Sequence, residues 1–110
     1  MDKEEKLFNE IVEKMASENK NVEAGKMMSS PGIKYKNKVF AFYYDKQMGF
    51  KLGKEFNPDE FKLKDYKFLS PFKNKPPMKA WFVIPYSENK KWKVLAEEAL
   101  KVISKEVDMM

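Results

Sequence analysis

The stretch Val39-Phe40-Ala41-Phe42-Tyr43-Tyr44 decides the fold of this 110-residue chain. It combines β-branched and aromatic residues with no Gly or Pro, which is typical of a buried β-strand. Asp45-Lys46-Gln47 then predicts a turn, and the returning strand is expected over Met48 to Leu52. Upstream, Asn37-Lys38 predicts a hairpin turn after a strand at Ile33-Lys34-Tyr35-Lys36. Three neighbouring strands are therefore expected in this part of the chain.

Two long amphipathic helices are predicted on either side of these strands. The first is expected from about Asp2 to about Glu18, because apolar residues recur there every three or four positions. The second is expected to start with Ser87 as its cap. Each apolar stripe must pack on another element, since an isolated helix of this length is marginal in water. The stripes consist of Leu7, Phe8, Ile11, Val12 and Met15, and of Trp92, Leu95, Ala96, Ala99, Leu100 and Ile103.

Two shorter signals complete the prediction of a single domain over residues 1–110. Asn57-Pro58-Asp59-Glu60 predicts a short middle helix that ends near Leu63 or Lys64. One or two strands are expected after it, of which Met78 to Ile84, ended by Pro85, is the clearer. The expected fold class is α+β: a mostly antiparallel sheet of about five strands, with the N- and C-terminal helices packed on one face.

Side-chain alternation predicts a sheet that is apolar on both faces. Phe40, Phe42 and Tyr44 share one face of their strand, and in the later strand Trp81 and Val83 oppose its other apolar residues. A sheet covered by helices on one side normally alternates apolar and polar residues, so the second face needs a cover. Three covers remain open: the loop around residues 68–72, a second subunit or partner protein, or stacked nucleic-acid bases. The candidate interaction surface consists of Tyr35, Phe40, Phe42, Tyr44, Trp81 and Val83.

Charge is unevenly distributed along the chain, whose 22 cationic side chains are all Lys and whose net charge is +5. Residues 1–23 hold four Lys and seven acids, residues 24–93 sixteen Lys and six acids, and residues 94–110 two Lys and four acids. A basic middle between acidic ends indicates either a polyanion-binding surface or lysines paired with acidic helices. Without Arg, contacts with nucleic acid would be salt-sensitive and blind to sequence. Lys34, Lys36, Lys38 and Lys46 form the candidate basic patch.

The composition excludes much catalytic chemistry. The chain has no Cys and no His, which removes disulfides, thiolate metal sites and His-based triads. Its glycines do not form a phosphate-binding loop, and Ser29 and Ser30 near Lys26 are too common a pattern to indicate a Ser–Lys dyad. We expect no catalytic residue, no cofactor and no metal. With no long apolar stretch and no signal-peptide pattern, a cytoplasmic protein without membrane contact is expected.

Several of these segments together resemble one protein family. They are Met27-Met28-Ser29-Ser30-Pro31-Gly32-Ile33-Lys34-Tyr35, Val39-Phe40-Ala41-Phe42, Met48-Gly49-Phe50-Lys51-Leu52, Ser70-Pro71-Phe72 and Met78-Lys79-Ala80-Trp81-Phe82-Val83-Ile84-Pro85. They are similar to the N-terminal domain of the TfoX family of competence regulators and related small proteins, although Ser29-Ser30 replaces a Gly-Gly pair of that family.

The resemblance implies a secretion-chaperone-like α+β fold and a regulatory or protein-interaction role without catalysis. The expected partner is an unidentified protein or a second copy of the chain. The alternative is a weak nucleic-acid-binding protein that uses its lysines.

Overall fold

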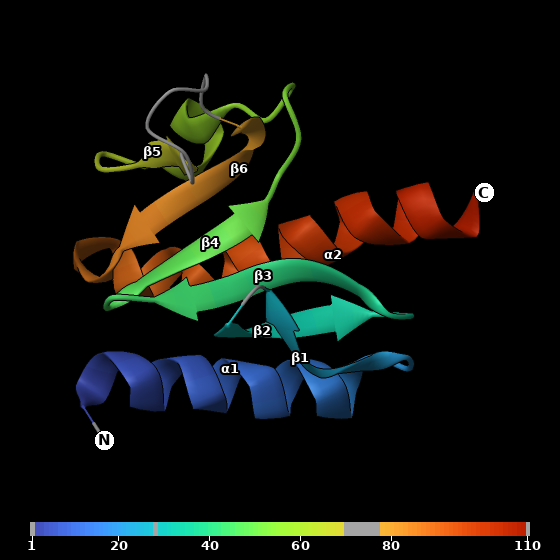
Figure 1. The fold of residues 1–110 in the computed structure, drawn as a ribbon. Helices are drawn as coiled ribbons and strands as arrows, with labels where there is room; N and C mark the ends of the chain where they lie inside the picture. Colours follow the sequence, from blue (N-terminus) through green and yellow to red (C-terminus); the bar gives the residue numbers. More distant parts are fainter. Residues whose placement is uncertain (1, 28, 70–77, 110) are drawn as a thin grey trace.

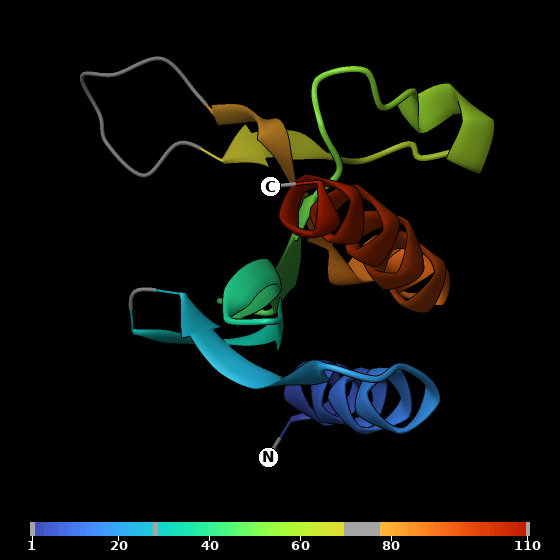
Figure 2. The same cartoon turned by 90° about the vertical axis from the view of Figure 1, so that its right-hand side faces the viewer.

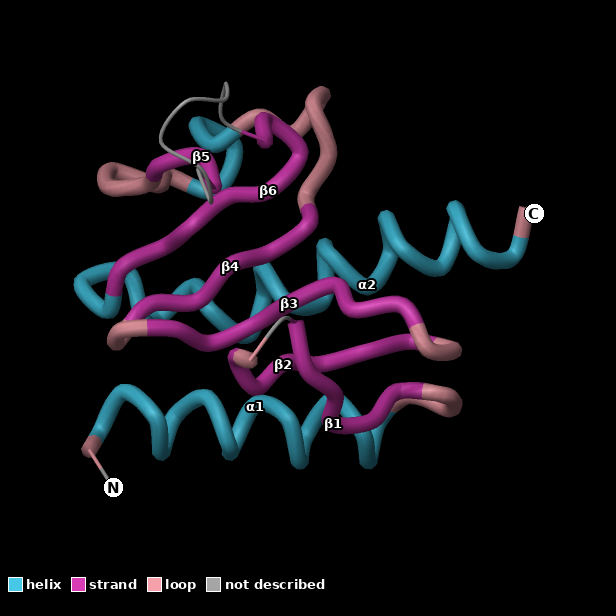
Figure 3. Tube along the Cα trace, viewed as in Figure 1, coloured by secondary structure: helices cyan, strands magenta, loops and turns pink. Residues whose placement is uncertain are grey.

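An antiparallel sheet of six strands runs through the part of the chain that the structure, a computed structural model, describes: residues 2–27, 29–69 and 78–109. The strands lie in the order β1-β2-β3-β4-β6-β5 (Figures 1 and 3). Every neighbouring pair is antiparallel. The elements are α1 (Lys3–Glu18), β1 (Val22–Met27), β2 (Ser30–Tyr35), β3 (Lys38–Tyr44), β4 (Gln47–Lys51), η1 (Pro58–Phe61), β5 (Lys67–Leu69), β6 (Met78–Pro85), η2 (Tyr86–Lys91) and α2 (Trp92–Asp108).

Both α-helices lie on the same side of the sheet, which we call the inner face (Figure 2). The first helix agrees with its prediction, and the side chain of Asp2 caps it by accepting a hydrogen bond from the backbone N–H of Glu5 at 3.0 Å. On the inner face the ring of Phe8 packs on Tyr43 with 5.4 Å between centroids. Trp92 at the start of α2 is fully buried in the same core. The α+β class and the two terminal helices are thus confirmed.

The sheet has one strand more than the sequence predicted, because β1 pairs along its whole length with β2. Ala24, Gly25 and Lys26 are weak strand formers, so local composition did not indicate this edge strand. The turn between β2 and β3 is Lys36-Asn37 rather than Asn37-Lys38, and both of its residues have positive φ. This geometry is that of a type I′ hairpin turn.

The second helix begins later than predicted. Ser87 does not cap it; Tyr86–Lys91 forms the 3-10 segment η2, and the α-helix starts at Trp92. The middle helix is likewise a single 3-10 turn, η1, in which the side chain of Asn57 accepts a hydrogen bond from the backbone N–H of Asp59 at 3.0 Å. The predicted cap at Asn57 is confirmed, but the segment ends at Phe61.

A β-bulge in β3 overturns the predicted alternation of faces. Ile33 pairs with Ala41 and the next residue, Lys34, pairs with Val39, so Phe40 is an extra residue without a partner in β2. One extra residue shifts the side chains before it to the opposite face. Phe40 therefore lies fully buried in the inner core beside Ala41, whereas Val39 packs on the outer cluster. The prediction that Phe40 shares a face with Phe42 is wrong for this reason.

Candidate functional site

The face of the sheet opposite the helices, which we call the outer face, carries a small apolar cluster of its own. Phe42, Trp81 and Val83 form it, and each is 7% exposed. The rings of Phe42 and Trp81 are 5.7 Å apart and tilted by 50°. Met27, Val39, Leu69 and Ala80 pack around these three side chains.

Glycines make room for this cluster. Gly25, Gly32, Phe42, Gly49, Val83 and Lys67 are successive partners across the six strands, so three glycines lie in one cross-strand row. The ring of Phe42 lies over Gly49, where a Cβ atom would come within 2.1 Å of Cε1 of that ring. Because Gly49 has no side chain, Phe42 reaches across β4 towards Val83 and Trp81 on β6.

A depression of about 260 Å³ lies beside this cluster, and we call it the outer groove. Tyr44, at its rim, is 66% exposed, whereas Phe42 and Val83 contribute buried side chains. Asp45 and Lys67 also line it, and neither has an ion pair within the described residues. The full lining is Phe42, Tyr44, Asp45, Gln47, Lys67, Phe68, Leu69 and Val83. The groove thus combines an apolar floor with one free charge of each sign.

A second, shallower hollow of about 400 Å³ shares Gln47, Lys67 and Val83 with the outer groove. It reaches Asp65 and Ser87, whose hydroxyl donates a hydrogen bond to the Asp65 carboxylate at 3.4 Å. Together the two hollows extend from the β3–β4 turn to β5 and the start of η2.

The structure divides the candidate interaction surface between the two faces. Phe42, Tyr44, Trp81 and Val83 belong to the outer face, but Tyr35 and Phe40 lie in the inner core. Tyr44 is the only one of the six that is broadly exposed. Sequence reasoning did not select Asp45 and Gln47 of the β3–β4 turn, nor Lys67, whose strand β5 was not predicted to lie beside β6. Phe68 and Leu69 belong to the segment that it gave as one possible cover of this face. Leu69 does cover part of the outer cluster, while Pro71 and Phe72 lie outside the described residues.

The candidate basic patch is brought together only in part, because Lys34, Lys36 and Lys38 lie in the β2–β3 hairpin and Lys46 does not. Lys36 and Lys38 lie at the β2–β3 turn, whereas Lys46 lies at the other end of β3, about 20 Å away at the usual rise of a strand. Lys34 pairs with Glu23 at 3.4 Å, Lys36 with Asp108 at 2.8 Å, and Lys46 approaches Glu4 at 4.0 Å. Three of the four lysines therefore have a carboxylate beside them.

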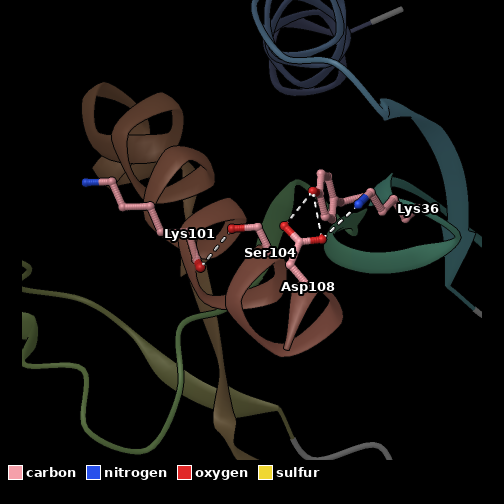
Figure 4. A network of polar contacts seen from close by, with 5 residues as sticks. Lys36, Lys101, Ser104 and Asp108 are labelled. Atoms are coloured by element: carbon pink, nitrogen blue, oxygen red, sulfur yellow. Dashed lines mark hydrogen bonds and ion pairs between the residues drawn. The ribbon is translucent and has the colours of Figure 1, made fainter. Parts of the chain in front are cut away.

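The contact between Lys36 and Asp108 belongs to a small network at the end of α2 (Figure 4). The Tyr35 hydroxyl donates to both carboxylate oxygens of Asp108, at 3.0 and 3.2 Å. The hydrogen bond from Lys36, followed by that from Tyr35, lowers the pKa of the Asp108 carboxyl. The same contact with Asp108 raises the pKa of Lys36. Tyr35 and Lys36 therefore fasten the last turn of α2 to the β2–β3 turn.

Within the described residues, no group of three or more acidic side chains is placed to hold a metal ion. No helix there is long and apolar enough to span a lipid bilayer. Comparison with protein-family models, curated proteins and solved structures finds no match for this chain.

Proposed function

We propose that this chain is a non-enzymatic protein-interaction module, similar to the N-terminal domain of the TfoX family and to secretion-chaperone-like folds. Its contact surface is the outer groove. The observation that carries the proposal is Tyr44, which stands 66% exposed at the rim of a depression with Phe42 and Val83 in its lining. Exposed aromatic residues beside an apolar floor are typical of the centres of protein interfaces.

The charges around the groove favour a protein partner over a nucleic acid. Asp45 and Lys67 give the groove one negative and one positive side chain, and Asp65 adds a carboxylate to the adjoining hollow. A phosphate backbone would be repelled by these carboxylates, whereas a protein surface can supply both signs. The lysines predicted to bind nucleic acid lie elsewhere, and most of them contact carboxylates of this chain.

A capture experiment from lysate of the source cells tests the proposal. The immobilised wild-type chain is compared with Tyr44→Ser, and with Val94→Ser as a control that removes an exposed apolar side chain from α2. We expect the wild type and the control to retain the same protein after nuclease treatment, and Tyr44→Ser to lose most of it, because truncating a central aromatic residue often costs about 2 kcal/mol or more. Equal retention by all three chains would overturn the proposal. Retention that nuclease abolishes would support the nucleic-acid alternative.

A further inference from the structure

Building on this proposed function, we propose that the partner of the outer groove is a second copy of this chain. The two copies pack outer face to outer face about a two-fold axis that runs between the two sheets and parallel to them, and Asp45 of each copy meets Lys67 of the other.

A two-fold interface must be its own complement, because the same patch contributes both sides. The outer groove meets this condition in its charges. Asp45 in the β3–β4 turn and Lys67 on β5 are separated by β4 and β6, about 12 Å at the usual strand spacing. Lys67 is level with Phe42, three residues before Asp45, so the two charges are also offset by about 10 Å along the strands and lie roughly 15 Å apart. A two-fold axis midway between these two residues places Asp45 of one copy opposite Lys67 of the other, and Lys67 opposite Asp45.

Both charges are available for such a contact. Neither Asp45 nor Lys67 has an ion pair within the described residues. By contrast, Lys51, at the end of β4, contacts Glu106 at 2.8 Å. Two intermolecular pairs would therefore form without breaking an existing ion pair.

The side chains on the outer face protrude little at its centre, which allows a second sheet to approach closely. Sheets that pack face to face lie about 10 Å apart, and their side chains fill the space between them. Gly49 leaves β4 without a protruding side chain between Phe42 and Val83, so the centre of the patch is low. Tyr44 stands at its rim, and the hollow beside the cluster can receive Tyr44 of the second copy.

The size of the patch sets the expected affinity. Four strands at about 4.8 Å spacing and about 17–20 Å length span roughly 300 Å² in projection. A standard stable interface buries about 800 Å² on each partner, so we expect a weak dimer with a Kd in the micromolar range or above. The monomer–dimer equilibrium should therefore be visible between about 10 µM and about 1 mM.

Charge reversal tests the arrangement by sedimentation velocity over this range. Asp45→Lys sets two ammonium groups against each other at each contact, and Lys67→Asp sets two carboxylates against each other, so each single variant should raise the dimer Kd at least about tenfold. The double variant Asp45→Lys/Lys67→Asp should dimerise like the wild type. An equimolar mixture of the two single variants should also recover the dimer, as a heterodimer. Both contacts between the unlike chains then join an ammonium group to a carboxylate.

Controls separate the contact from folding and net charge. Asp45 has a φ of 50°, so Asp45→Asn, which tolerates this conformation, serves as a second variant that removes the charge and keeps the turn. It should weaken the dimer without changing the thermal midpoint of the monomer. Glu55→Lys and Lys20→Asp reverse exposed charges that do not line the groove and should leave the dimer Kd unchanged.

A wild-type chain that stays monomeric throughout the range would overturn the inference. So would a dimer that is insensitive to both reversals, or a double variant that stays monomeric. If the chain is monomeric but Tyr44 is still required to retain a different protein from lysate, this inference fails while the proposed function stands. If capture also fails, both are lost.

Discussion

At the scale of single residues, three glycines differ in how much room a side chain would have on the outer face. A Cβ atom at Gly49 would lie 2.1 Å from the ring of Phe42, and one at Gly32 would lie 2.6 Å from the carbonyl oxygen of Ala41. At Gly25 the nearest atoms are in the Lys34 side chain, at 3.0 Å. The first two obstacles are a packed ring and the backbone, whereas the third is a flexible chain that can move aside.

These distances predict an order of stability for alanine substitutions. We expect Gly49→Ala to lower the free energy of unfolding by about 1–3 kcal/mol, because Phe42 must leave its packed position. Gly25→Ala should change it by less than about 1 kcal/mol, in the stabilising direction, since Ala loses less conformational entropy in a strand than Gly. Urea unfolding followed by Trp fluorescence measures both.

The double variant Gly49→Ala/Phe42→Leu checks the cause of the first effect. A smaller side chain at residue 42 relieves the clash with the new methyl group, so the two substitutions together should cost less than the sum of their separate effects. Strict additivity, or equal stability of Gly49→Ala and Gly25→Ala, would show that Phe42 does not lie over Gly49.

At the scale of elements, the residue pattern predicted the helix and strand segments that are stabilised by neighbours in the sequence. The first helix was predicted to within a residue at its start, because its apolar period is contained in the sequence of α1 itself and its cap, Asp2, immediately precedes it. The strand over residues 39–44 was equally clear from its composition. Its bulge was not, because the extra residue Phe40 depends on how β2 aligns with β3, and pairing register is not a local property.

The outer groove could be predicted only in part for the same reason. Phe42, Tyr44 and Val83 were selected from side-chain alternation, and they do line it. Lys67 and Leu69 belong to a strand of three residues that is held by its pairing with β6, so no periodic signal marks it. The free charges that give the groove its chemistry therefore appear only once the sheet order is known.

The end of α2 gives a prediction about pH. Asp108 lies at the C-terminus of the helix, where negative charge is unfavourable, and Lys36 and Tyr35 compensate for it. Their hydrogen bonds, that of Lys36 first, lower the pKa of Asp108 in the folded state. An unfolded Asp has a pKa of about 3.9, so this contact contributes stability above that pH. The contribution is lost as the pH falls through the lower folded-state pKa.

NMR titration of the Asp108 carboxyl carbon checks this directly. We expect a midpoint below the ordinary range of Asp in the wild type, a higher midpoint in Lys36→Gln, and a smaller increase in Tyr35→Phe. Lys38→Gln is the matched control, because Lys38 is exposed at the same turn and is not a partner of Asp108. An unchanged midpoint in Lys36→Gln would contradict the assignment.

At the scale of the whole molecule, carboxylates from the acidic ends of the chain pair with lysines of its basic middle. Five of the ion pairs within the described residues join an acid of residues 1–23 or 94–110 to a lysine of residues 24–93 that lies outside the acid's own helix or strand. The remaining three lie within a single turn of helix. The five pairs are Glu4–Lys46, Glu18–Lys93, Glu23–Lys34, Glu106–Lys51 and Asp108–Lys36.

This arrangement predicts that the acids suppress binding of polyanions. The variant Glu23→Gln/Glu106→Gln/Asp108→Asn removes the carboxylates that contact Lys34, Lys51 and Lys36. We expect it to bind a labelled single-stranded oligonucleotide at least about tenfold more tightly than the wild type at about 50 mM salt, with a steeper loss of affinity by about 200 mM, because the released lysines displace counterions from the phosphates. Fluorescence anisotropy at both salt concentrations measures this.

A second triple variant separates released lysines from a general increase in positive charge. Glu10→Gln/Glu13→Gln/Glu55→Gln removes the same number of acids, all exposed and none in an ion pair within the described residues. Net charge alone acts over the Debye length and would strengthen binding equally in both variants. If the pairs matter, the first variant binds more tightly and shows the steeper salt dependence. Equal affinities would mean that the paired lysines were already free to contact phosphate.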